Sequence, residues 1–515
     1  MAETKHITLR QKRVFLWTLV LGLLTHGFRL SNKFLCCDSY NYLESISRSW
    51  TVAMGRYLLH LVEAVRGNYE LTWLIGLLSI VFIAAAAVLV AEIFDIRDSF
   101  SQVLTGFIMV ANPVVTGTFA YMYTADGYFF GMMLSVLAVY LLFVYQGKWG
   151  IPLAALSLAA SMAFYQSYLS VTIVLIMFKL LLLLLDKEKK LKEVFRTAGI
   201  CLTAGITAMV VYLAGMKLAW QIFDSEMADY MGLKDARGGI VSRITGAFVS
   251  SYVEFARFLL VRWKLTFYNV TNVLVILVVI AMVLTLIIKR KLYKEPLKVI
   301  LMVLLGLLLP VATHIFAFIS EGVSYISSPM SYSMCLIWIM PLLLGGKLKA
   351  SAGDGNKLKI GTAFIWRALL TAVCLHFVVI AAQSYESMDR ANRQTERLIN
   401  RIEARMELEE GYSDDMDIAI YGNLWQMPEY VPSAPMMSGV VSNIYLSTQR
   451  EYVAALNWYV SAEYGNAGEK RKKELAKLPE FSEMKPWPSK DSVKVIDGTM
   501  VLFLSDDEIE KYTEE

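Results

Sequence analysis

Long apolar runs, each close to the length that a membrane-spanning helix needs, recur between Val14 and Ile380. A hydrocarbon core about 30 Å thick requires roughly 20 apolar residues in one helix. The runs are continuous rather than alternating, which predicts helices and excludes a β-barrel. Only 18% of the 515 residues are charged, whereas an ordinary soluble domain has about 25%. The sequence therefore predicts an all-α polytopic membrane protein.

About eleven membrane-spanning helices are predicted by this length rule, near residues 14–28, 71–91, 100–119, 127–145, 150–164, 166–185, 197–215, 270–288, 297–319, 330–345 and 361–382. The first run follows the basic segment 5–13 and lacks a small-residue cleavage pattern, so we expect an uncleaved helix with its amino end in the cytoplasm. Alternation then places the basic loops 186–196 and 289–298 inside, as the positive-inside rule requires. An odd number of spans leaves the carboxyl end outside, and one span more or fewer would reverse that.

The composition changes abruptly after Ala382, from apolar to rich in Arg, Glu and Asn. We therefore predict a polytopic transmembrane domain, 1–382, and a water-soluble extracytoplasmic domain, 383–515. The second domain has patterns of a polar helix, a strand and a β-hairpin, at residues 390–410, 417–421 and 493–504. The hairpin prediction rests on the turn pair Asp497-Gly498. A small α/β domain is expected.

The first outer loop has apolar residues in steps of three and four, which predicts one amphipathic helix over residues 38–66. Its apolar stripe consists of Leu43, Ile46, Trp50, Met54, Tyr57, Leu61 and Val65. Arg56, His60 and Glu63 lie off the stripe, so we expect the helix to lie in the membrane interface. Asp38, at its amino end, is then either an N-cap worth about 1 kcal/mol or a general base on the outer side. The residue types leave both open.

Asp126 and Gly127 stand where one predicted helix ends and the next begins. Asp-Gly is a common turn pair, which is a sufficient structural explanation. Asp126 is also a second carboxylate at the same outer surface as Asp38. Two such carboxylates could act as a base and its orienting partner, or could hold a divalent cation, Mg²⁺ or Mn²⁺.

Basic and aromatic residues interleave at the end of the long outer loop 216–269, where Arg257 and Arg262 precede a predicted span. This pattern is typical of interfacial anchoring, but the planar guanidinium also suits a lipid phosphate. Tyr165 and Gln166, at the outer end of another helix, either hydrogen-bond a sugar or pack between helices. Both pairs are candidate substrate-binding residues.

Two classes of function are disfavoured. The spans have almost no Asp, Glu, Lys or Arg near mid-membrane, which counts against an ion-coupled transporter. No G-x-G-x-x-G or Walker pattern indicates nucleotide binding, and no nucleic-acid partner is expected. The five cysteines have neither metal-binding nor disulfide-framework spacing.

Short motifs in the first 185 residues resemble the bacterial O-antigen glucosyltransferase family of the Gtr type, within the broad GT-C superfamily. These motifs are Cys37-Asp38-Ser39-Tyr40, Met54-Gly55-Arg56-Tyr57, Tyr123-Thr124-Ala125-Asp126-Gly127-Tyr128 and Phe164-Tyr165-Gln166-Ser167-Tyr168. The resemblance implies inverting transfer of a sugar, often glucose, from a polyprenyl phosphate to a cell-surface glycan outside the bacterial cytoplasmic membrane. It implies a base at Asp38, a second acidic position at Asp126, and Arg56 as the arginine of a Gly-Arg pair.

Such a reaction needs a carboxylate that takes the acceptor hydroxyl proton and donors that stabilise the departing phosphate. A groove between helices would hold the prenyl tail, and aromatic residues of the outer loops, Tyr40 among them, would stack on sugar faces. Two alternatives stay open. One is a flippase or transporter of lipid-linked glycans, in which replacing Asp38 would leave movement intact. The other is a surface receptor whose tail binds a ligand.

Overall fold

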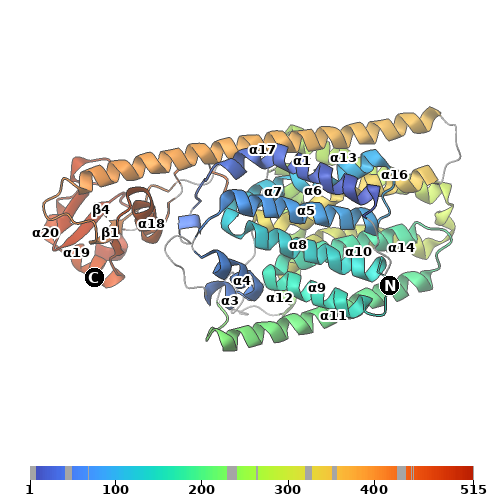
Figure 1. Ribbon diagram of the computed structural model, residues 1–515, viewed down its shortest axis with the longest axis horizontal. Coiled ribbons are helices and arrows are strands. Elements are labelled where there is room, and N and C mark those ends of the chain that lie inside the picture. The colour runs from blue at the N-terminus through green and yellow to red at the C-terminus, as the bar shows by residue number, and fades with distance from the viewer. Residues whose placement is uncertain are drawn as a thin grey trace.

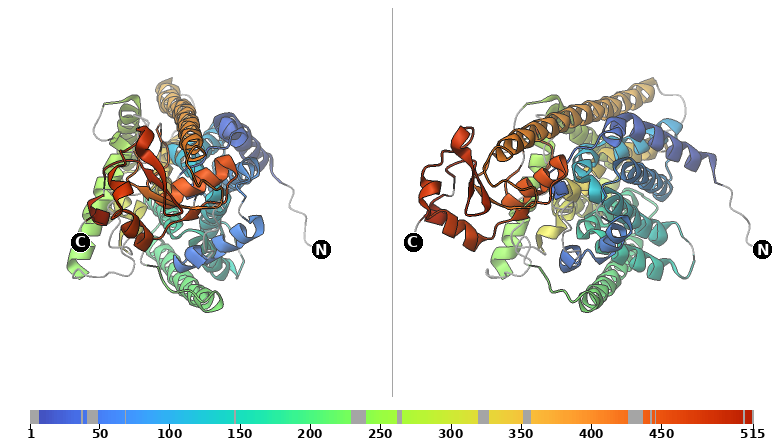
Figure 2. Two further views of the ribbon diagram at one scale, coloured as in Figure 1. Left: turned by 90° about the vertical axis from the view of Figure 1, so that its left-hand side faces the viewer. Right: turned by 60° about the vertical axis from the view of Figure 1, so that its left-hand side comes forward.

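The computed structural model is a bundle of long helices with one small sheet beyond one end (Figure 1). It describes residues 7–36, 38–40, 49–67, 69–145, 147–228, 240–261, 265–318, 327–350, 357–425, 437–441, 443–444, 446–507 and 509–513. The right-hand view of Figure 2 shows the sheet beyond one end of the bundle, and the left-hand view looks at the molecule from that end. The protein therefore has a helical body and a separate tail domain.

The body owes its helices to the apolar runs, because a helix satisfies every backbone hydrogen bond within one segment. The long helices are α1 (Leu9–Ser31), α5 (Thr72–Ile93), α6 (Ser99–Ala111), α8 (Met122–Phe143), α9 (Gly150–Phe164), α10 (Leu169–Leu184), α11 (Leu191–Ile222), α12 (Ile240–Leu260), α13 (Phe267–Lys289), α14 (Pro296–Thr313), α16 (Met340–Ala350) and α17 (Lys357–Met406). The shorter ones are α3 (Ser49–Ala53), α4 (Tyr57–Arg66), α7 (Pro113–Thr118), α15 (Tyr332–Cys335), η1 (Phe119–Tyr121), η2 (Gln166–Tyr168), η4 (Leu292–Lys294), η5 (Ile315–Phe318), η6 (Ser328–Ser331) and η7 (Leu336–Ile339).

Nine helical stretches of the described chain are long and apolar enough to cross a membrane. The predicted count of eleven is not confirmed, and two differences explain the discrepancy. The predicted spans 100–119 and 127–145 belong to one stretch, Ser99–Phe143, and the predicted span 150–164 is a helix of only 15 residues. The long stretch turns back at η1, since both of its ends lie beside the loop that follows α5: Asp98 caps α6, and Lys179 lies over the rings of both Phe94 and Phe143.

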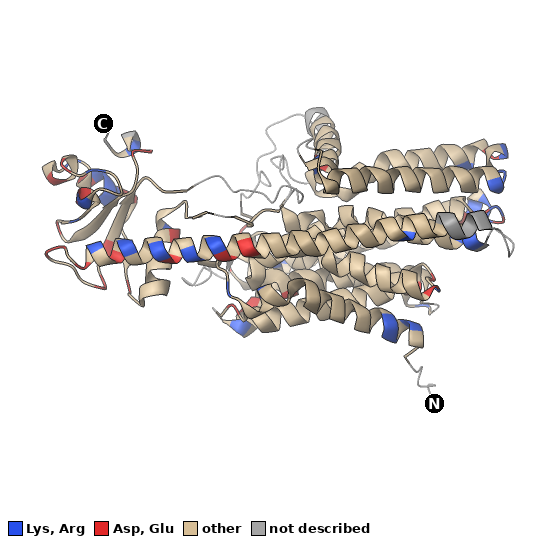
Figure 3. Cartoon of the chain, turned by 90° about the horizontal axis from the view of Figure 1, so that it is seen from above, with Lys and Arg blue, Asp and Glu red and all other residues tan. Residues whose placement is uncertain are grey.

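Charged contacts tie the loops together at the end of the body away from the sheet. Arg10 pairs with Glu92 and Asp95, at N···O distances of 2.5 and 2.8 Å. Arg367 pairs with Asp98 at 2.9 Å. Figure 3 shows Lys and Arg gathered at this end. The opposite end, beside the tail domain, carries the loops that were predicted to face outward.

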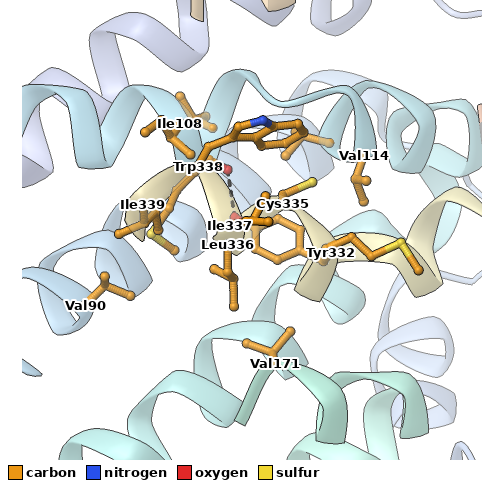
Figure 4. Packing of buried hydrophobic residues seen from close by; sticks show 14 of the residues in the cluster. Val90, Ile108, Val114, Val171, Tyr332, Cys335, Leu336, Ile337, Trp338 and Ile339 are labelled. Atoms are coloured by element: carbon orange, nitrogen blue, oxygen red, sulfur yellow. Dashed lines mark hydrogen bonds between the residues drawn. The ribbon is translucent and has the colours of Figure 1, made fainter. Parts of the chain in front are cut away.

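The centre of the body is an interrupted helix, α15 and η7, in which every residue is buried. The fully buried Trp338 donates from its indole to Asn272 Oδ1 at 2.9 Å. Figure 4 shows Ile108, Val114 and Val171 packed around this segment. The change from an α-helix to a 3₁₀ helix takes place here inside a shell of neighbouring helices.

The tail domain has a four-stranded sheet in the order β2-β1-β4-β3. Its elements are β1 (Asp417–Tyr421), α18 (Gln449–Val460), β2 (Gly465–Asn466), α19 (Glu469–Leu475), α20 (Pro479–Ser482), η8 (Lys490–Ser492), β3 (Val493–Ile496), β4 (Thr499–Phe503) and α21 (Glu510–Thr513). The predicted strand is β1, and the predicted hairpin is the antiparallel pair β3–β4. Both predictions are confirmed.

Helix α17 joins the two parts of the molecule without interruption. It has 50 residues and passes through position 382, where the composition changes. The predicted polar helix over residues 390–410 is its second half. Figure 3 shows α17 almost free of charge along the body and densely charged along the tail domain.

The predicted single helix over residues 38–66 is wrong. Residues 38–40 are helical, and α3 and α4 are separate helices with Gly55 between them. Gly55 has φ +76°, a left-handed conformation that interrupts a helix. Leu43 and Ile46 of the predicted stripe lie outside the described residues.

Candidate active site

Helix α4 is amphipathic, and its polar face points into the protein. His60 and Glu63 are buried, whereas Leu61 and Val65 are 53% and 89% exposed. The helix packs against α8 and α9 at the tail-domain end of the body (Figure 1). An apolar face turned outward is what a helix in the bilayer interface requires. Of its polar side chains, His60 packs on Phe223, Glu63 accepts from Thr51, and Arg66 reaches Asp126 of α8.

Two residues from other helices hold the loop that precedes α4. Gln166 donates from Nε2 to the Met54 carbonyl at 2.6 Å and to the Tyr212 hydroxyl at 3.0 Å. The Tyr212 hydroxyl donates to the Gly55 carbonyl at 3.2 Å. A Cβ on Gly55 would lie 2.5 Å from the Tyr212 oxygen. Gln166, predicted as a sugar ligand, uses its amide here to position this loop.

Arg56 leaves this loop and lies over aromatic rings. Its Nη1 donates to the Tyr128 hydroxyl at 3.1 Å, and its guanidinium lies 4.6 Å from the Tyr165 ring centroid. The Tyr128 and Tyr165 rings stack with centroids 4.4 Å apart. The structure thus brings together two predicted site residues, Arg56 and Tyr165, as a cation over an aromatic face.

Asp126 forms a buried ion pair with Arg66. The predicted turn at Asp126 is wrong, because α8 begins at Met122 and continues through this position. Asp126 Oδ1 accepts from the Gly127 amide at 2.8 Å and lies 3.3 Å from Arg66 Nη1, and the two side chains are 7% and 10% exposed. Among the described residues, neither terminal nitrogen of Arg66 has a hydrogen-bond acceptor. A buried guanidinium with donors to spare is suited to an anionic ligand.

Asp38 faces the beginning of the same helix. The Tyr123 hydroxyl donates to Asp38 Oδ2 at 3.3 Å, and Tyr123 lies three residues before Asp126, on one face of α8. The turn around Asp38 begins at Cys36, whose carbonyl accepts from the Ser39 amide at 2.9 Å. Asp38 therefore lies two residues after the start of this turn. The two predicted carboxylates both lie at the first turns of α8, at the tail-domain end of the body.

The tail domain holds the segment on both sides of Asp38. The Asn392 side-chain oxygen accepts from the Leu35 amide and from the Tyr459 hydroxyl, each at 3.2 Å. The Tyr459 and Tyr40 hydroxyls lie 3.2 Å apart. Tyr40, predicted as a substrate-binding residue, is only 2% exposed and packs in the tail-domain core.

Lys33 also contacts the tail domain. Lys33 Nζ lies 3.9 Å from the ring centroid of Trp458 on α18. Burial lowers the pKa of the Lys33 ammonium group, while the nearby Glu70 carboxylate acts in the opposite direction. The cation–π contact partly compensates for the lost hydration of the ammonium group.

The other two predicted basic residues lie elsewhere. Arg257, on α12, pairs with Glu254 at 2.6 Å. Helix α12 packs against α13, α14 and η5, so in the described part of the chain Arg257 stands apart from the cluster between α4 and α8. Arg262 lies outside the described residues.

Arg66 was missed by the analysis of the sequence. Arg56, His60 and Glu63 follow one another at steps of four and three, and a further step of three reaches Arg66. The periodic polar stripe could therefore have identified it. Its partner Asp126 lies 60 positions further along the chain, so the ion pair itself has no local signal.

A divalent cation has little support from the ligands present. No group of three His, Cys, Asp or Glu side chains within the described ranges could hold a metal ion. Asp126 Oδ1 already faces a guanidinium, so a cation there would compete with Arg66 for the same oxygen. We assign no step of the chemistry to a metal.

A family model described as Glucosyl transferase GtrII matches residues 27–345. The matched range includes Asp38, α3, α4 and the whole of α8, and it ends before α17 and the tail domain. No curated protein and no solved structure matches the chain.

Proposed function

Because the chain belongs to the GtrII glucosyl transferase family, we propose that it is an inverting membrane enzyme that moves glucose from a polyprenyl-phosphate donor to a cell-surface glycan. The observation that carries this proposal is the buried cluster of charged side chains between α4 and α8, beside Asp38. A lipid-linked sugar phosphate has its reacting bond at the membrane interface. The outward apolar face of α4 supports the same depth for this cluster.

Asp38 is the proposed base. An acceptor hydroxyl oxygen attacks C1 of the glucose from the face opposite the phosphate, and a new C1–O bond forms. The bond between C1 and the phosphate oxygen breaks, and its electron pair leaves with the phosphate. The hydroxyl proton passes to Asp38, whose carboxylate is oriented by the Tyr123 hydroxyl. A positioned base contributes roughly 10²–10⁴-fold to such a reaction.

Arg66 and Arg56 are the proposed phosphate-binding groups. The departing phosphate gains negative charge, so fixed cations beside it stabilise the transition state. Arg66 has spare donors and is held in place by Asp126, which makes Asp126 a positioning partner and not a second base. Arg56 is fixed over Tyr165 and bonded to Tyr128 of α8, and it offers a second guanidinium at the other end of α4.

The orientation in the membrane follows from the charges. The end of the body that carries Arg10, Arg290 and Lys298 faces the cytoplasm by the positive-inside rule. Asp38 and the tail domain then lie on the outer side, where a surface glycan is available. The bilayer supplies the donor laterally, between helices.

The test is transfer of radiolabelled glucose from synthetic polyprenyl-phosphate glucose to envelope glycan, by purified protein in lipid nanodiscs. We expect the wild type to transfer and Asp38→Asn to lose at least about a hundredfold in rate. Asp414→Asn, an exposed tail-domain carboxylate, is the matched control and should keep full activity. Full activity of Asp38→Asn would overturn the base. Transfer from nucleotide-linked glucose alone would overturn the donor, and retained anomeric configuration in the product would overturn inversion.

A further inference from the structure

The tail domain contains a cavity of about 560 Å³ that the proposed reaction does not use. This volume is within the range of about 300–1,000 Å³ that small-molecule sites occupy. The polar and aromatic residues that line it are Gln394, Arg397, Arg401, Trp425 and Trp487. The first three belong to α17 and share one face, since they are spaced by three and four residues. One helix face thus supplies all the polar groups that line the cavity.

The polar side chains of this lining are mainly hydrogen-bond donors. The two guanidinium groups and one amide offer many donors, and none of the lining residues that the structure describes is acidic. Trp425 is 37% exposed and presents an indole face. A ligand must therefore combine many acceptor oxygens with flat apolar faces. A saccharide has this combination, because hydroxyl or acidic groups surround a ring whose C–H faces stack on indole.

The walls of the cavity are held in place by the tail domain itself. Arg405 donates to the Ser489 and Pro488 carbonyls at 2.6 and 3.0 Å, and its guanidinium lies 4.2 Å from the Trp487 ring centroid. The Trp425 amide donates to Asn423 Oδ1 at 2.9 Å. Aromatic walls that are fixed before binding reduce the entropy cost of binding.

The cavity is connected to the candidate active site through the chain. Trp425 and Ile444 both line it, and the segment 437–441, between them in the sequence, lies against the body. Within this segment, Ser438 Oγ accepts from the Ser328 amide at 3.0 Å. Gly439 packs so closely on η1 that a Cβ there would lie 3.2 Å from the Tyr121 ring. Tyr121 is two residues from Tyr123, which contacts Asp38.

The cavity lies only a short distance further along α17 than the residue that contacts the Asp38 segment. Asn392, which holds the Asp38 segment, precedes Gln394 by two residues and Arg401 by nine on α17. At a rise of 1.5 Å per residue, these residues lie about 3 and 14 Å further from the membrane. A glycan chain held in the cavity could therefore extend toward the candidate active site.

We propose that this cavity is a binding subsite for the saccharide chain of the acceptor, remote from the reacting hydroxyl. The inference rests on the proposed function for the identity of the glycan. The indole face of Trp425 stacks on a sugar ring, and Gln394, Arg397 and Arg401 donate to sugar oxygens. Arg401 is positioned for this by the Trp487 ring, whose centroid lies 5.2 Å from its guanidinium. The subsite recognises the acceptor chain and takes no part in bond making.

The experiment uses full-length protein in nanodiscs and two acceptors prepared from the envelope polysaccharide of the producing cell: the lipid-free polymer and a single repeat unit. The variants are Trp425→Leu and the double change Arg397→Gln with Arg401→Gln. We expect KM for the polymer to rise at least fivefold, while KM for the single repeat, KM for the donor and kcat stay unchanged. Arg393→Gln, which removes an arginine that is paired with Asp389 on the same helix, is the matched control.

Direct binding separates this inference from the proposed function. Isothermal titration with the lipid-free polymer should give binding by the wild type that both variants lose. Wild-type transfer with an unchanged polymer KM in the variants would overturn the subsite and leave the enzyme proposal standing. Polymer binding without transfer from any polyprenyl-phosphate sugar would support the subsite and overturn the enzyme proposal. Loss of kcat for both acceptors would also overturn the subsite, because it would indicate a general structural effect.

Discussion

The hydroxyl groups of Tyr40 and Tyr459 lie 3.2 Å apart, and this contact joins the segment that carries Asp38 to helix α18. Asn392 reinforces it by accepting hydrogen bonds from both Leu35 and Tyr459. A residue proposed to act in the membrane interface is thus held in part by a domain that lies outside the matched family range. The tail domain is therefore expected to influence the chemical step.

Tyr459→Phe should lower kcat several-fold while leaving KM for the donor unchanged. The change removes a hydrogen-bonding hydroxyl, worth about 1 kcal/mol, from the contact that positions Asp38, and it keeps the ring. Steady-state kinetics of glucose transfer would measure both constants. Tyr412→Phe is the control, since it removes a hydroxyl bonded to Tyr464 inside the tail domain at 2.7 Å. Equal losses in the two variants would contradict a role in positioning Asp38.

Arg66 and Asp126 should behave as a coupled pair. Removing one partner of a buried ion pair costs about 3–5 kcal/mol, because the other charge is left uncompensated. Arg66→Gln and Asp126→Asn should each lower the thermal unfolding temperature, and the double variant should be more stable than the two single effects added together. Unfolding in detergent, followed by tryptophan fluorescence, would test this.

Activity measurements distinguish a stabilising role of the Arg66–Asp126 pair from a role in binding phosphate. The double variant should stay inactive even where its stability recovers, because the phosphate has lost a guanidinium. Arg66→Lys should keep the charge, lose the planar fork, and raise KM for the donor. A fully active double variant would show that the pair serves stability alone.

Gly55→Ala should destabilise the protein by about 1–3 kcal/mol and reduce transfer. Its φ of +76° disfavours any side chain, and a Cβ would lie 2.5 Å from the Tyr212 oxygen. Adding Tyr212→Phe should recover part of the loss by removing that oxygen. Gly199→Ala, where a Cβ would meet nothing within 4 Å, should have no harmful effect. If Gly55→Ala and Gly199→Ala have the same effect, then the positive φ of Gly55 and its close contact with Tyr212 are not the reason that glycine is needed there.

The outward face of α4 should contact lipid. A photoactivatable benzophenone amino acid at Val65, which is 89% exposed, should form adducts with phospholipid in nanodiscs, detectable by mass spectrometry. The same probe at Ser482, exposed on α20, should give none. Absence of lipid adducts at Val65 would place α4 in water and weaken the assignment of the cluster to the membrane interface.

The sequence predicted what depends on local pattern. The strand at 417–421 and the hairpin around Asp497-Gly498 follow from alternation and a turn pair, and both are present. The helical body follows from the apolar runs alone. The count of eleven spans is not confirmed, because Ser99–Phe143 forms one continuous helical stretch and Gly150–Phe164 is a helix of only 15 residues.

The site was harder to predict, because distant residues determine it. Asp38, Asp126 and Arg56 were proposed from their positions in the predicted outer loops and from the family resemblance, and Asp126 lies within α8 instead of a loop. Gly55 interrupts the predicted helix in a conformation held by Gln166 and Tyr212, more than a hundred positions away. No local sequence pattern predicts these contacts, and none predicts the ion pair between Arg66 and Asp126.

Helix α17 anchors the body and the tail domain through one face. Tyr385 lies 2.6 Å from His26 of α1, and Asn392, seven residues later, contacts the chain just after α1. Between Thr362 and Met406 the helix contains neither glycine nor proline. We therefore expect it to behave as one rigid helix, so that a rotation at one end also rotates the other. One residue inserted between the two anchors would turn the tail domain by about 100°, whereas seven would restore its angle and displace it by about 10 Å. The number of residues between Tyr385 and Asn392 therefore sets the rotational orientation of the tail domain relative to the body.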